Sequence, residues 1–342
     1  MAPRRVLVTG VSRYLGEALA RQLSDDPSIE AVVGVDTHPP RDSLGRADFV
    51  RADIRNPLIA RVITAAEVDT VVHTNVLASS HLAGGRAAMK EVNVIGTMQL
   101  LAACQKAPSL RTLVLKSTAA VYGRSPRDPA VLTEEMEPRA LPVTGYAKDA
   151  VEVEGYVRGF GRRRPDVALT VLRFSNFIGP RIDSTLTRYF GLGIAPTLLG
   201  SDPRLQMIHE DDALAVLRLA ADGERPGVFN VAGDGVLMLS QALRRLGRPS
   251  VPLPAPASGL VRRALRLVQT DVLTPEQMSF LGHGRVVDTT ALRTAFGFTP
   301  AYSTSEAFED YATAHPGPLR SIPVPVLAAA ASLADRRRAA HA

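Results

Sequence analysis

Residues 6–16 read VLVTGVSRYLG, and this stretch decides the fold. It begins with a short run rich in β-branched residues, turns at Gly10, and passes into a helical pattern. A strand, a glycine turn and a helix in this order direct backbone N–H groups and the helix dipole at a bound diphosphate. The stretch therefore predicts a dinucleotide-binding unit at the start of the chain.

The rest of the first half repeats this alternation of strands and helices. The strand candidates are continuous apolar runs, which is typical of strands covered on both faces. We expect strands at residues 6–8, 31–35, 49–51, 70–73, 112–115 and 169–172, and helices at 15–24, 57–66, 86–105 and 145–163. This order predicts an α/β fold with a Rossmann-type, doubly wound parallel sheet.

The alternation of strand and helix patterns ends near residue 175, where Pro and Gly become frequent. We expect a Rossmann domain over residues 1–175, a mainly substrate-binding lid region over 176–315 that is interleaved with the last sheet elements, and an Ala- and Arg-rich tail over 316–342. Helices of the lid region are expected to be short and isolated, as at 211–221 and 239–246. Asp211 or Asp212 is expected to cap the first of them.

The composition limits the classes of protein to which this chain can belong. The 342 residues are 46% hydrophobic and carry a net charge of +6, as in a globular protein that prefers an anionic small molecule. The arginine clusters at 162–164 and 336–338 lack interleaved aromatics, so nucleic acid is not expected as a partner. No stretch is apolar enough to span a membrane, no signal peptide is evident, and Cys104 is the single cysteine. We expect a cytoplasmic protein without disulfides or a metal site.

The glycine loop departs from the usual pattern of three glycines. Gly10 and Gly16 stand at its ends, and Arg13 or Tyr14, depending on alignment, takes the place of the middle glycine. That glycine normally lets the backbone approach the pyrophosphate. A side chain there must project away, or the dinucleotide must shift.

The residues after the second and third strands favour NAD over NADP. Asp36 ends the second strand about twenty residues after the glycine turn, where a carboxylate accepts the ribose hydroxyls and repels a 2′-phosphate. Arg13 and Arg41 argue mildly the other way, because an arginine pairs well with phosphate. Asp53 and Ile54 suit an adenine contact and an apolar wall.

A series of motifs, in their order along the chain, carries a family resemblance. They are Thr9-Gly10 with Gly16, Asp36, Asp53-Ile54-Arg55, and the stretches 71–73, 93–97, 117–123, Tyr146 and 172–180. Together they resemble the extended short-chain dehydrogenase/reductase family, in its NAD-dependent epimerase/dehydratase branch, with UDP-glucose 4-epimerase-like proteins as the nearest type. The resemblance covers roughly residues 4 to 312.

The glycine loop and the resemblance together imply roles for matching positions. The expected dinucleotide-binding residues are Gly10, Ser12, Arg13, Tyr14, Leu15, Gly16, Asp36, Asp53, Ile54, Thr74, Asn75, Asn93, Ser117 and Ser175. In particular, Asn93 is implied to hold the nicotinamide side. The expected substrate residues are Asn176, Arg181, Arg204 and Arg285, with the arginines facing the diphosphate of a nucleotide-sugar.

The implied acid–base residues are Tyr146 and Thr118, but the family's lysine is absent. The family places it four residues after the tyrosine, where its charge stabilises the phenolate, and Ala150 stands there. Lys148 is turned about 200° away from Tyr146 on a helix, so it is expected at the surface. Lys116 shares a sheet face with Thr118, and we consider it as a replacement. The alternative is that it pairs with a structural acid or lies beside the strand end.

Two functions remain open. The first is an NAD-dependent epimerase, dehydratase or dehydrogenase acting on a nucleotide-sugar. The second is an NAD-binding protein with lost or weak catalysis, acting in sensing or as a structural partner; the missing glycine and lysine favour it. Members of the family often dimerise through helices equivalent to 86–105 and 145–163. We therefore expect a homodimer, with contacts from Met98, Leu101, Val153 and Val157.

Overall fold

A seven-stranded parallel sheet forms the centre of the computed structural model, which describes residues 4–78, 83–123, 125, 127–142, 145–223, 225–254, 282 and 284–317. The strand order is β11-β6-β5-β4-β1-β2-β3. The strands are β1 (Arg4–Thr9), β2 (Ile29–Asp36), β3 (Asp48–Arg51), β4 (Thr70–His73), β5 (Thr112–Thr118), β6 (Ala168–Phe174) and β11 (Gly227–Val231). Each neighbouring pair is parallel, which confirms the predicted fold class.

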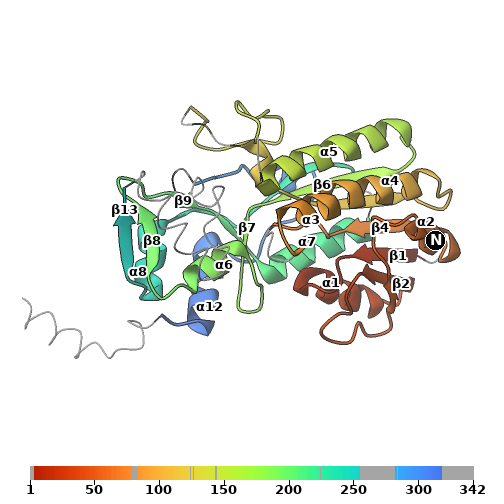
Figure 1. The fold of residues 1–342 in the computed structure, drawn as a ribbon, viewed down its shortest axis with the longest axis horizontal. Helices are drawn as coiled ribbons and strands as arrows, with labels where there is room; N and C mark the ends of the chain where they lie inside the picture. Colours follow the sequence, from red (N-terminus) through yellow and green to blue (C-terminus); the bar gives the residue numbers. More distant parts are fainter. Residues whose placement is uncertain are drawn as a thin grey trace, which may run out of the picture.

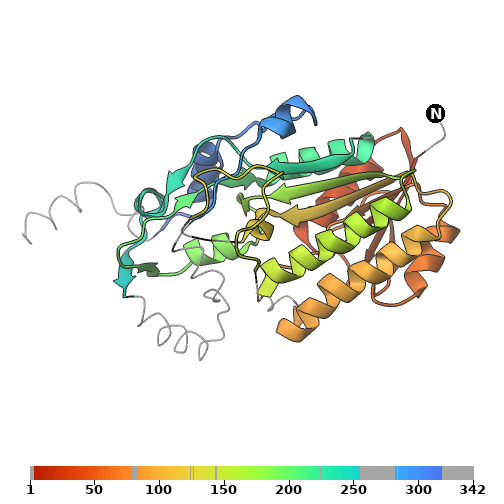
Figure 2. The same cartoon turned by 90° about the horizontal axis from the view of Figure 1, so that it is seen from above.

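Helices cover both faces of this sheet (Figure 1). One face carries α2 (Leu58–Ala65), α4 (Thr97–Gln105) and α5 (Gly145–Arg163), and the other carries α1 (Tyr14–Ser24), α7 (Glu210–Asp222) and α11 (Thr290–Thr294). Figure 2 shows α4 and α5 side by side along the first face. Along β1, Leu7 packs into one cluster while Val6 and Val8 pack into the other. This double burial is why the strands are continuous apolar runs.

The expected helix over residues 86–105 is present, with a π-helical turn at its centre. It consists of α3 (Arg86–Lys90), the π-helical η2 (Glu91–Gly96) and α4 in direct succession. Gly96 lies against the β3–α2 connection, since a Cβ on it would come 2.7 Å from the Ile54 side chain. π-Helical turns are frequent at functional sites.

A smaller lobe beyond β6 has its own apolar core. Its elements are β7 (Asn176–Ile178), α6 (Thr185–Phe190), β8 (Ala195–Leu198), β9 (Arg204–Leu205), β10 (Met207–His209), β12 (Leu237–Met238), α8 (Leu239–Leu246), β13 (Ser250–Leu253) and α12 (Thr304–Ala314). Phe190, Phe308 and Tyr311 meet in that core.

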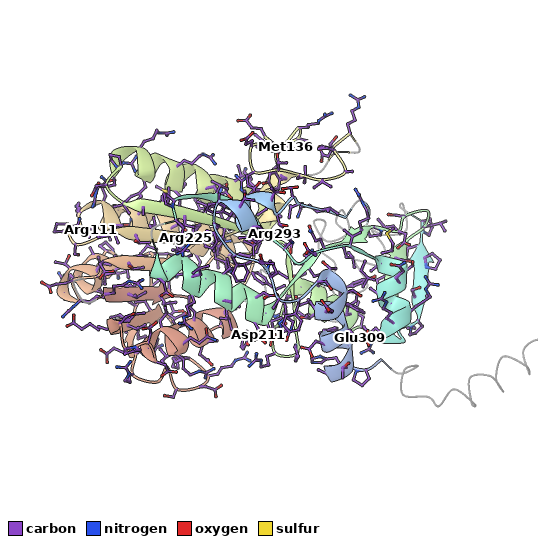
Figure 3. The ribbon with its side chains drawn as sticks, turned by 180° about the vertical axis from the view of Figure 1, so that it is seen from behind. Arg111, Met136, Asp211, Arg225, Arg293 and Glu309 are labelled. Carbon is purple, nitrogen blue, oxygen red and sulfur yellow. The ribbon has the colours of Figure 1, made fainter. Side chains whose placement is uncertain are left out.

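The expectation of isolated helices after residue 175 was wrong for α7. This helix spans 13 residues and buries Leu214 and Leu217 in the cluster that also holds α1. Figure 3 shows it from behind, lying along the sheet, with Asp211 near the end that faces α12. The strand β11 follows it and was not predicted, because the polar Asn230 interrupts a short apolar run.

The described chain ends at Gly317, whose N–H donates to the Leu246 carbonyl at 3.0 Å. The rest of the expected tail, with the arginines at 336–338, lies outside the described residues. Within the described ranges, we find no helix with the length and apolarity that crossing a membrane requires.

Candidate functional site

The strand order reverses between β1 and β4, and we call the space at the carboxyl ends of these two strands the crevice. Ligands of open α/β sheets bind at such a switch point, at the carboxyl ends of the strands. Gly10 ends β1 there with a φ of +83°, and a Cβ on it would lie 2.8 Å from the Thr74 hydroxyl. A Cβ on Gly16 would lie 2.3 Å from the Gly10 carbonyl. Both glycines are therefore needed for the close packing of β1, α1 and the loop after β4.

The wall of the crevice on the β4 side is tightly hydrogen-bonded. The Thr74 hydroxyl donates to the Thr9 carbonyl at 2.6 Å, and Asn75 follows it beside Gly10. His73 lies deeper, 2.8 Å from the Thr9 hydroxyl and 2.9 Å from the Thr97 hydroxyl. Burial lowers the pKa of His73 to about 3, and the charge of Lys116 adds to this shift. His73 is thus a neutral, structural histidine.

Arg13 and Tyr14 have different surroundings, although either aligns with the missing glycine. Arg13 occupies the N-cap position with an extended backbone, and no side chain caps the helix that follows. Burial lowers the pKa of its guanidinium, and the charge of Asp36 opposes that shift. Tyr14 begins the helix and reaches toward α7, and Leu15 is buried in the core. Arg13 therefore stands at the end of the glycine turn, while Tyr14 and Leu15 belong to α1.

Asp36 stands at the end of β2, as expected, and its carboxylate already has partners. It accepts the Ser12 N–H at 3.0 Å, the Ser12 hydroxyl at 2.7 Å and the Thr37 N–H at 2.7 Å. Ser12 is thus bound to Asp36 across the entrance of the crevice. Ribose hydroxyls would join this carboxylate or replace the Ser12 hydroxyl on it.

Asp53 and Ile54 follow β3. Arg55 donates to both Asp53 oxygens, and these hydrogen bonds lower the pKa of the Asp53 carboxyl. Ile54 is buried and packs against Gly96. The apolar wall is in place, while the Asp53 carboxylate is already held by Arg55.

Asn93 is fully buried and fixes the loop after β4. Its side-chain oxygen accepts the Leu77 N–H at 2.7 Å, and its amide donates to the Leu77 carbonyl at 3.0 Å and to Asp149 at 3.3 Å. Asp149 is also bound by both terminal nitrogens of Arg86, at 2.7 Å each. In this structure the polar atoms of Asn93 are engaged within the protein.

Lys116 reaches into the crevice from β5. Its Nζ donates to the Val76 carbonyl at 3.2 Å and lies 5.9 Å from the Phe177 ring centroid. Among the described residues, no carboxylate forms an ion pair with it, so the expected alternative of a structural acid is not met there. Burial lowers the pKa of Lys116 to about 8, and the charge of Arg13 contributes. The residue as a whole is half-buried.

Thr118 and Ser117 point to opposite sides of β5. The Thr118 hydroxyl accepts the Ala120 N–H at 3.1 Å and lines a pocket. Ser117 is buried and donates to Glu154 on α5 at 2.5 Å. Thr118 is thus available to a ligand, while Ser117 belongs to the interior.

Tyr146 lies in the first turn of α5 and is partly buried against the apolar cluster beneath the sheet. One turn later, Ala150 is 1% exposed and packs in a cluster with Ala119 and Tyr122. Lys148 is 43% exposed and lies 4.0 Å from Glu152, so it is a surface residue as expected. The position of the family's lysine is therefore filled by a small apolar side chain.

A small pocket opens at the carboxyl ends of β5 and β6. Its lining residues are Thr118, Ala119, Phe174, Ser175, Asn176, Gln206, Arg285 and Val287. The structure thus brings Thr118, Ser175, Asn176 and Arg285 together, as the sequence predicts for a shared site. The Ser175 hydroxyl is buried and has no hydrogen-bond partner among the described residues. A buried polar atom of this kind usually has a hydrogen-bond partner, and a ligand or a water could supply it.

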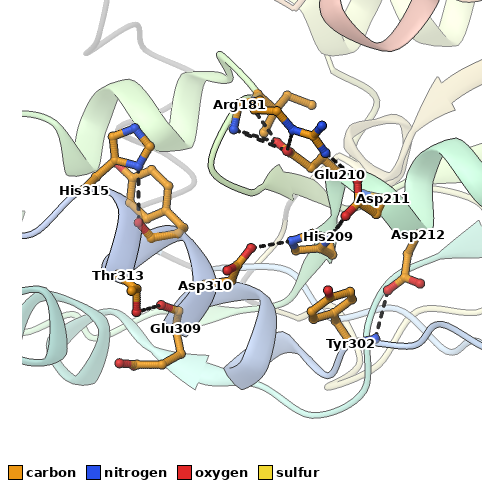
Figure 4. Close-up of polar contacts among 12 residues, drawn as sticks. Arg181, His209, Glu210, Asp211, Asp212, Tyr302, Glu309, Asp310, Thr313 and His315 are labelled. Carbon is orange, nitrogen blue, oxygen red and sulfur yellow. Dashed lines mark hydrogen bonds and ion pairs between the residues drawn. The ribbon is translucent and has the colours of Figure 1, made fainter. Parts of the chain in front are cut away.

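Two of the expected substrate arginines lie apart from that lining set. Arg181 donates to Glu210 and to Asp211 at 2.7 Å each (Figure 4). Its guanidinium also lies 5.2 Å from the Tyr14 ring centroid. Arg204 lies on β9, and its carbonyl accepts the Arg285 N–H at 3.3 Å. Arg181 therefore ties the lobe to α7 and Tyr14.

The helix cap expected from Asp211 or Asp212 was wrong. His209 caps α7, because its Nδ1 accepts the Asp211 N–H at 3.1 Å (Figure 4). Its Nε2 lies 3.0 Å from Asp310, and Tyr302 stacks on its ring. Asp212 accepts the Tyr302 N–H at 3.0 Å and thereby fastens a later segment. His209 is buried and structural.

One buried polar network was missed by sequence reasoning. Arg173 donates to Glu154 at 2.7 Å and to the Tyr122 hydroxyl at 2.9 Å, and that hydroxyl donates to Asn230 at 2.8 Å. Burial opposes the charge of Arg173, but the Glu154 carboxylate raises its pKa. The sequence feature that could have revealed this network is an arginine within the apolar strand LTVLRF, residues 169–174. Ser117 of β5 joins the same network through Glu154.

Comparisons with known proteins place this geometry in context. Residues 6–232 match the NAD dependent epimerase/dehydratase family. An uncharacterized protein of Mycobacterium tuberculosis is 51% identical over 318 residues, which cover 90% of this chain and 83% of that protein. Among solved structures, UDP-glucose 4-epimerase of Thermotoga maritima with UDP-glucose is 20% identical with a TM-score of 0.69, and covers 91% of this chain and 98% of its own.

A second solved structure is similar in the same degree. UDP-glucuronic acid 4-epimerase from Bacillus cereus, in complex with UDP-glucuronic acid and NAD, is 19% identical with a TM-score of 0.70. It covers 91% of this chain and 98% of its own. At these identities, the two structures show that the fold is shared.

Proposed function

The chain belongs to the NAD-dependent epimerase/dehydratase family, and on that premise we propose that it is an NAD-dependent oxidoreductase of a nucleotide-sugar. The family match confirms the resemblance that the ordered motifs indicated. The observation that carries the proposal is the pocket that Thr118, Ser175, Asn176 and Arg285 share at the carboxyl ends of β5 and β6.

The crevice fits a dinucleotide. The start of α1 has no side-chain cap, so its first N–H groups remain for the phosphates of a ligand. Gly10 and Gly16 leave no side chain between the turn and the helix. We assign the adenosine ribose to Asp36, where its hydroxyls would take acceptor positions now used by Ser12, and this favours NAD over NADP.

The pocket would hold the sugar. When bound, the nicotinamide accepts or returns a hydride. Tyr146 would take the proton of the substrate hydroxyl, and Thr118 would orient that hydroxyl by hydrogen bonding. Lys116 would bring a positive charge to the loop after β4, where its Nζ binds the Val76 carbonyl. Asn176 and Arg285 would bind the nucleotide-sugar on the lobe side. The solved structures of similar fold with UDP-glucose and with UDP-glucuronic acid support the choice of sugar nucleotide.

The test is to release small molecules from the purified, denatured protein and to incubate the native protein with NAD and UDP-sugars. We expect released NAD, and either a transient rise in reduced nicotinamide absorbance or a new sugar nucleotide in the NMR spectrum. If the protein releases no NAD on denaturation and binds no added NAD, the proposal is refuted.

A second candidate function is dinucleotide binding without turnover. It is favoured by the burial of Ala150 among apolar side chains, which leaves no lysine on the face of α5 that carries Tyr146. Under this alternative the protein releases NAD on denaturation but converts no sugar nucleotide. The same incubation therefore separates the two functions.

We also propose a homodimer through α4 and α5. Of the residues expected at this interface, Leu101, Val153 and Val157 are buried inside the subunit, and only Met98 is exposed, at 40%. Ile95 of the preceding η2 and Tyr156 of α5 are also large exposed apolar residues, at 43% and 40%. Their apolar area would be buried against a second copy.

We expect the wild-type protein to have the mass of a dimer in solution and Met98→Lys to shift it toward the monomer. The added charge would have to be desolvated at the interface. The measurement is light scattering after size exclusion, with Leu199→Lys as a control because Leu199 is exposed in the distant lobe. A monomeric wild type would contradict this proposal.

A further inference from the structure

The first turn of α5 carries Tyr146, and a side chain from another helix binds this turn at two points. Arg86 is the first residue of α3. One of its terminal nitrogens donates to the Gly145 carbonyl at 2.9 Å and to Asp149 at 2.7 Å. Its other terminal nitrogen donates to the second Asp149 oxygen, also at 2.7 Å. Tyr146 therefore lies between the two residues of α5 that Arg86 binds.

The contact between Arg86 and Asp149 is a restrictive one. Two parallel hydrogen bonds between a guanidinium and a carboxylate fix the orientation of both groups. The Asp149 side chain is fully buried, whereas that of Arg86 is 40% exposed. Opening the pair would leave a buried carboxylate uncompensated, which is strongly unfavourable. The start of α3 and the start of α5 are thus held in one relative position.

The same carboxylate is connected to the wall of the crevice. Asn93, in the π-helical η2, donates to Asp149 at 3.3 Å and to the Leu77 carbonyl at 3.0 Å. Its side-chain oxygen accepts the Leu77 N–H at 2.7 Å. Leu77 belongs to the loop after β4 that begins with Thr74 and Asn75. One buried network therefore joins the turn that carries Tyr146 to the loop that forms the wall.

The position of Tyr146 matters because a general base must lie within hydrogen-bond reach of its proton. A displacement of about 1 Å in such a group can lower a rate about 100-fold. Ala150, one turn later on the same face of α5, has no polar group in its side chain that could orient the phenol. The attachment of the turn to α3 is therefore one of the contacts that determine where the phenol lies.

We propose that Arg86 is a positioning residue for Tyr146, and that it acts through the Gly145 carbonyl and the Asp149 side chain. The inference rests on the proposed function, in which Tyr146 moves the proton of the substrate hydroxyl. It adds to that function a pair, Arg86 and Asp149, that touches no substrate but fixes the turn from which the phenol projects.

The position of Tyr146 can be followed without turnover, by fluorine NMR of the full chain labelled with 3-fluorotyrosine. The chain has seven tyrosines, and the signal lost in Tyr146→Phe identifies the one of interest. We expect Arg86→Met to move or broaden the Tyr146 signal more than the other six. Amide exchange over residues 145–150 should become about tenfold faster, because hydrogen bonds to a charged group are lost.

The kinetic arm measures kcat and KM for the sugar nucleotide and the dissociation constant of NAD. We expect Arg86→Met to lower kcat about 10- to 100-fold. Both other constants should stay within about twofold of the wild type, because Asn93 still holds Leu77. Arg86→Lys keeps the charge without the planar fork, so its kcat should be intermediate.

Lys90→Met is the matched control, since Lys90 is exposed on the same helix and its loss removes the same charge. It should behave as the wild type in both arms. A double variant, Arg86→Met with Asp149→Asn, removes the attachment without leaving a buried charge, so it should fold even where Arg86→Met does not. We expect it to show the displaced Tyr146 signal and the lowered kcat.

The two arms separate this inference from the proposed function. If no sugar nucleotide is converted, a Tyr146 signal displaced by the loss of Arg86 but not of Lys90 supports the positioning role, while the enzyme fails. If the wild type has turnover and the double variant keeps the wild-type kcat, the inference is overturned and the enzyme stands. A Tyr146 signal that is undisturbed in the double variant overturns the inference whatever the kinetics.

Discussion

Tyr146→Phe is expected to lower turnover of a nucleotide-sugar by about two to four orders of magnitude, the usual contribution of a general acid–base group. The substitution removes one hydroxyl and keeps the ring that packs against the cluster beneath the sheet. The affinity for NAD should therefore stay within about twofold of the wild type, because a phenol at the sugar contributes little to diphosphate binding.

The measurement is kcat and KM for the sugar nucleotide, with the dissociation constant of NAD measured in parallel. Tyr156→Phe is the matched control, since Tyr156 lies on the same helix and is 40% exposed. It should leave turnover unchanged. Equal turnover in Tyr146→Phe and the wild type would remove Tyr146 from the reaction, and with it the mechanism proposed for this site.

Glu154→Gln is expected to lower the free energy of unfolding by about 3–5 kcal/mol, the usual cost of removing one partner from a buried ion pair. Glu154 and Arg173 are 4% and 10% exposed, and their closest atoms are 2.7 Å apart. Glutamine preserves the shape of the side chain but leaves the Arg173 charge without compensation. The Ser117 hydroxyl also loses a carboxylate acceptor that is 2.5 Å away.

Urea unfolding measures this effect directly. Glu152→Gln is the matched control on the same helix, because Glu152 pairs with Lys148 at the surface, where such a pair contributes about 0–1 kcal/mol. A double variant, Glu154→Leu with Arg173→Met, should recover much of the loss, because it removes both buried charges. Comparable losses in Glu154→Gln and Glu152→Gln would show that the buried pair contributes no more than a surface one.

Much of the fold was predictable from the sequence because its signals are local. The strand at 70–73 and the helices at 145–163 and 239–246 have the predicted bounds, since apolar periodicity and flanking turns are read within a few residues. The positions of Gly10 and Asp36 beside one crevice follow from the same logic, because parallel strands bring their carboxyl ends to one edge. The strand β11 escaped prediction because Asn230 serves a distant partner, Tyr122, rather than the local pattern.

In the candidate site, too, some features follow from local sequence signals and others from contacts across the fold. The sequence by itself predicted that Thr118 and Ser175 lie at one edge of the sheet, because the first ends a strand and the second follows one. Gln206 and Val287, which also line the pocket, were not predicted. Only the tertiary structure decided which polar groups remain for a ligand. It placed Arg181 on Glu210 and joined Asn93 to Leu77, and it left Lys116 without a carboxylate partner among the described residues. The physical reason is that a side chain's partner lies across the fold, where charge and burial are set by packing rather than by neighbours in the chain.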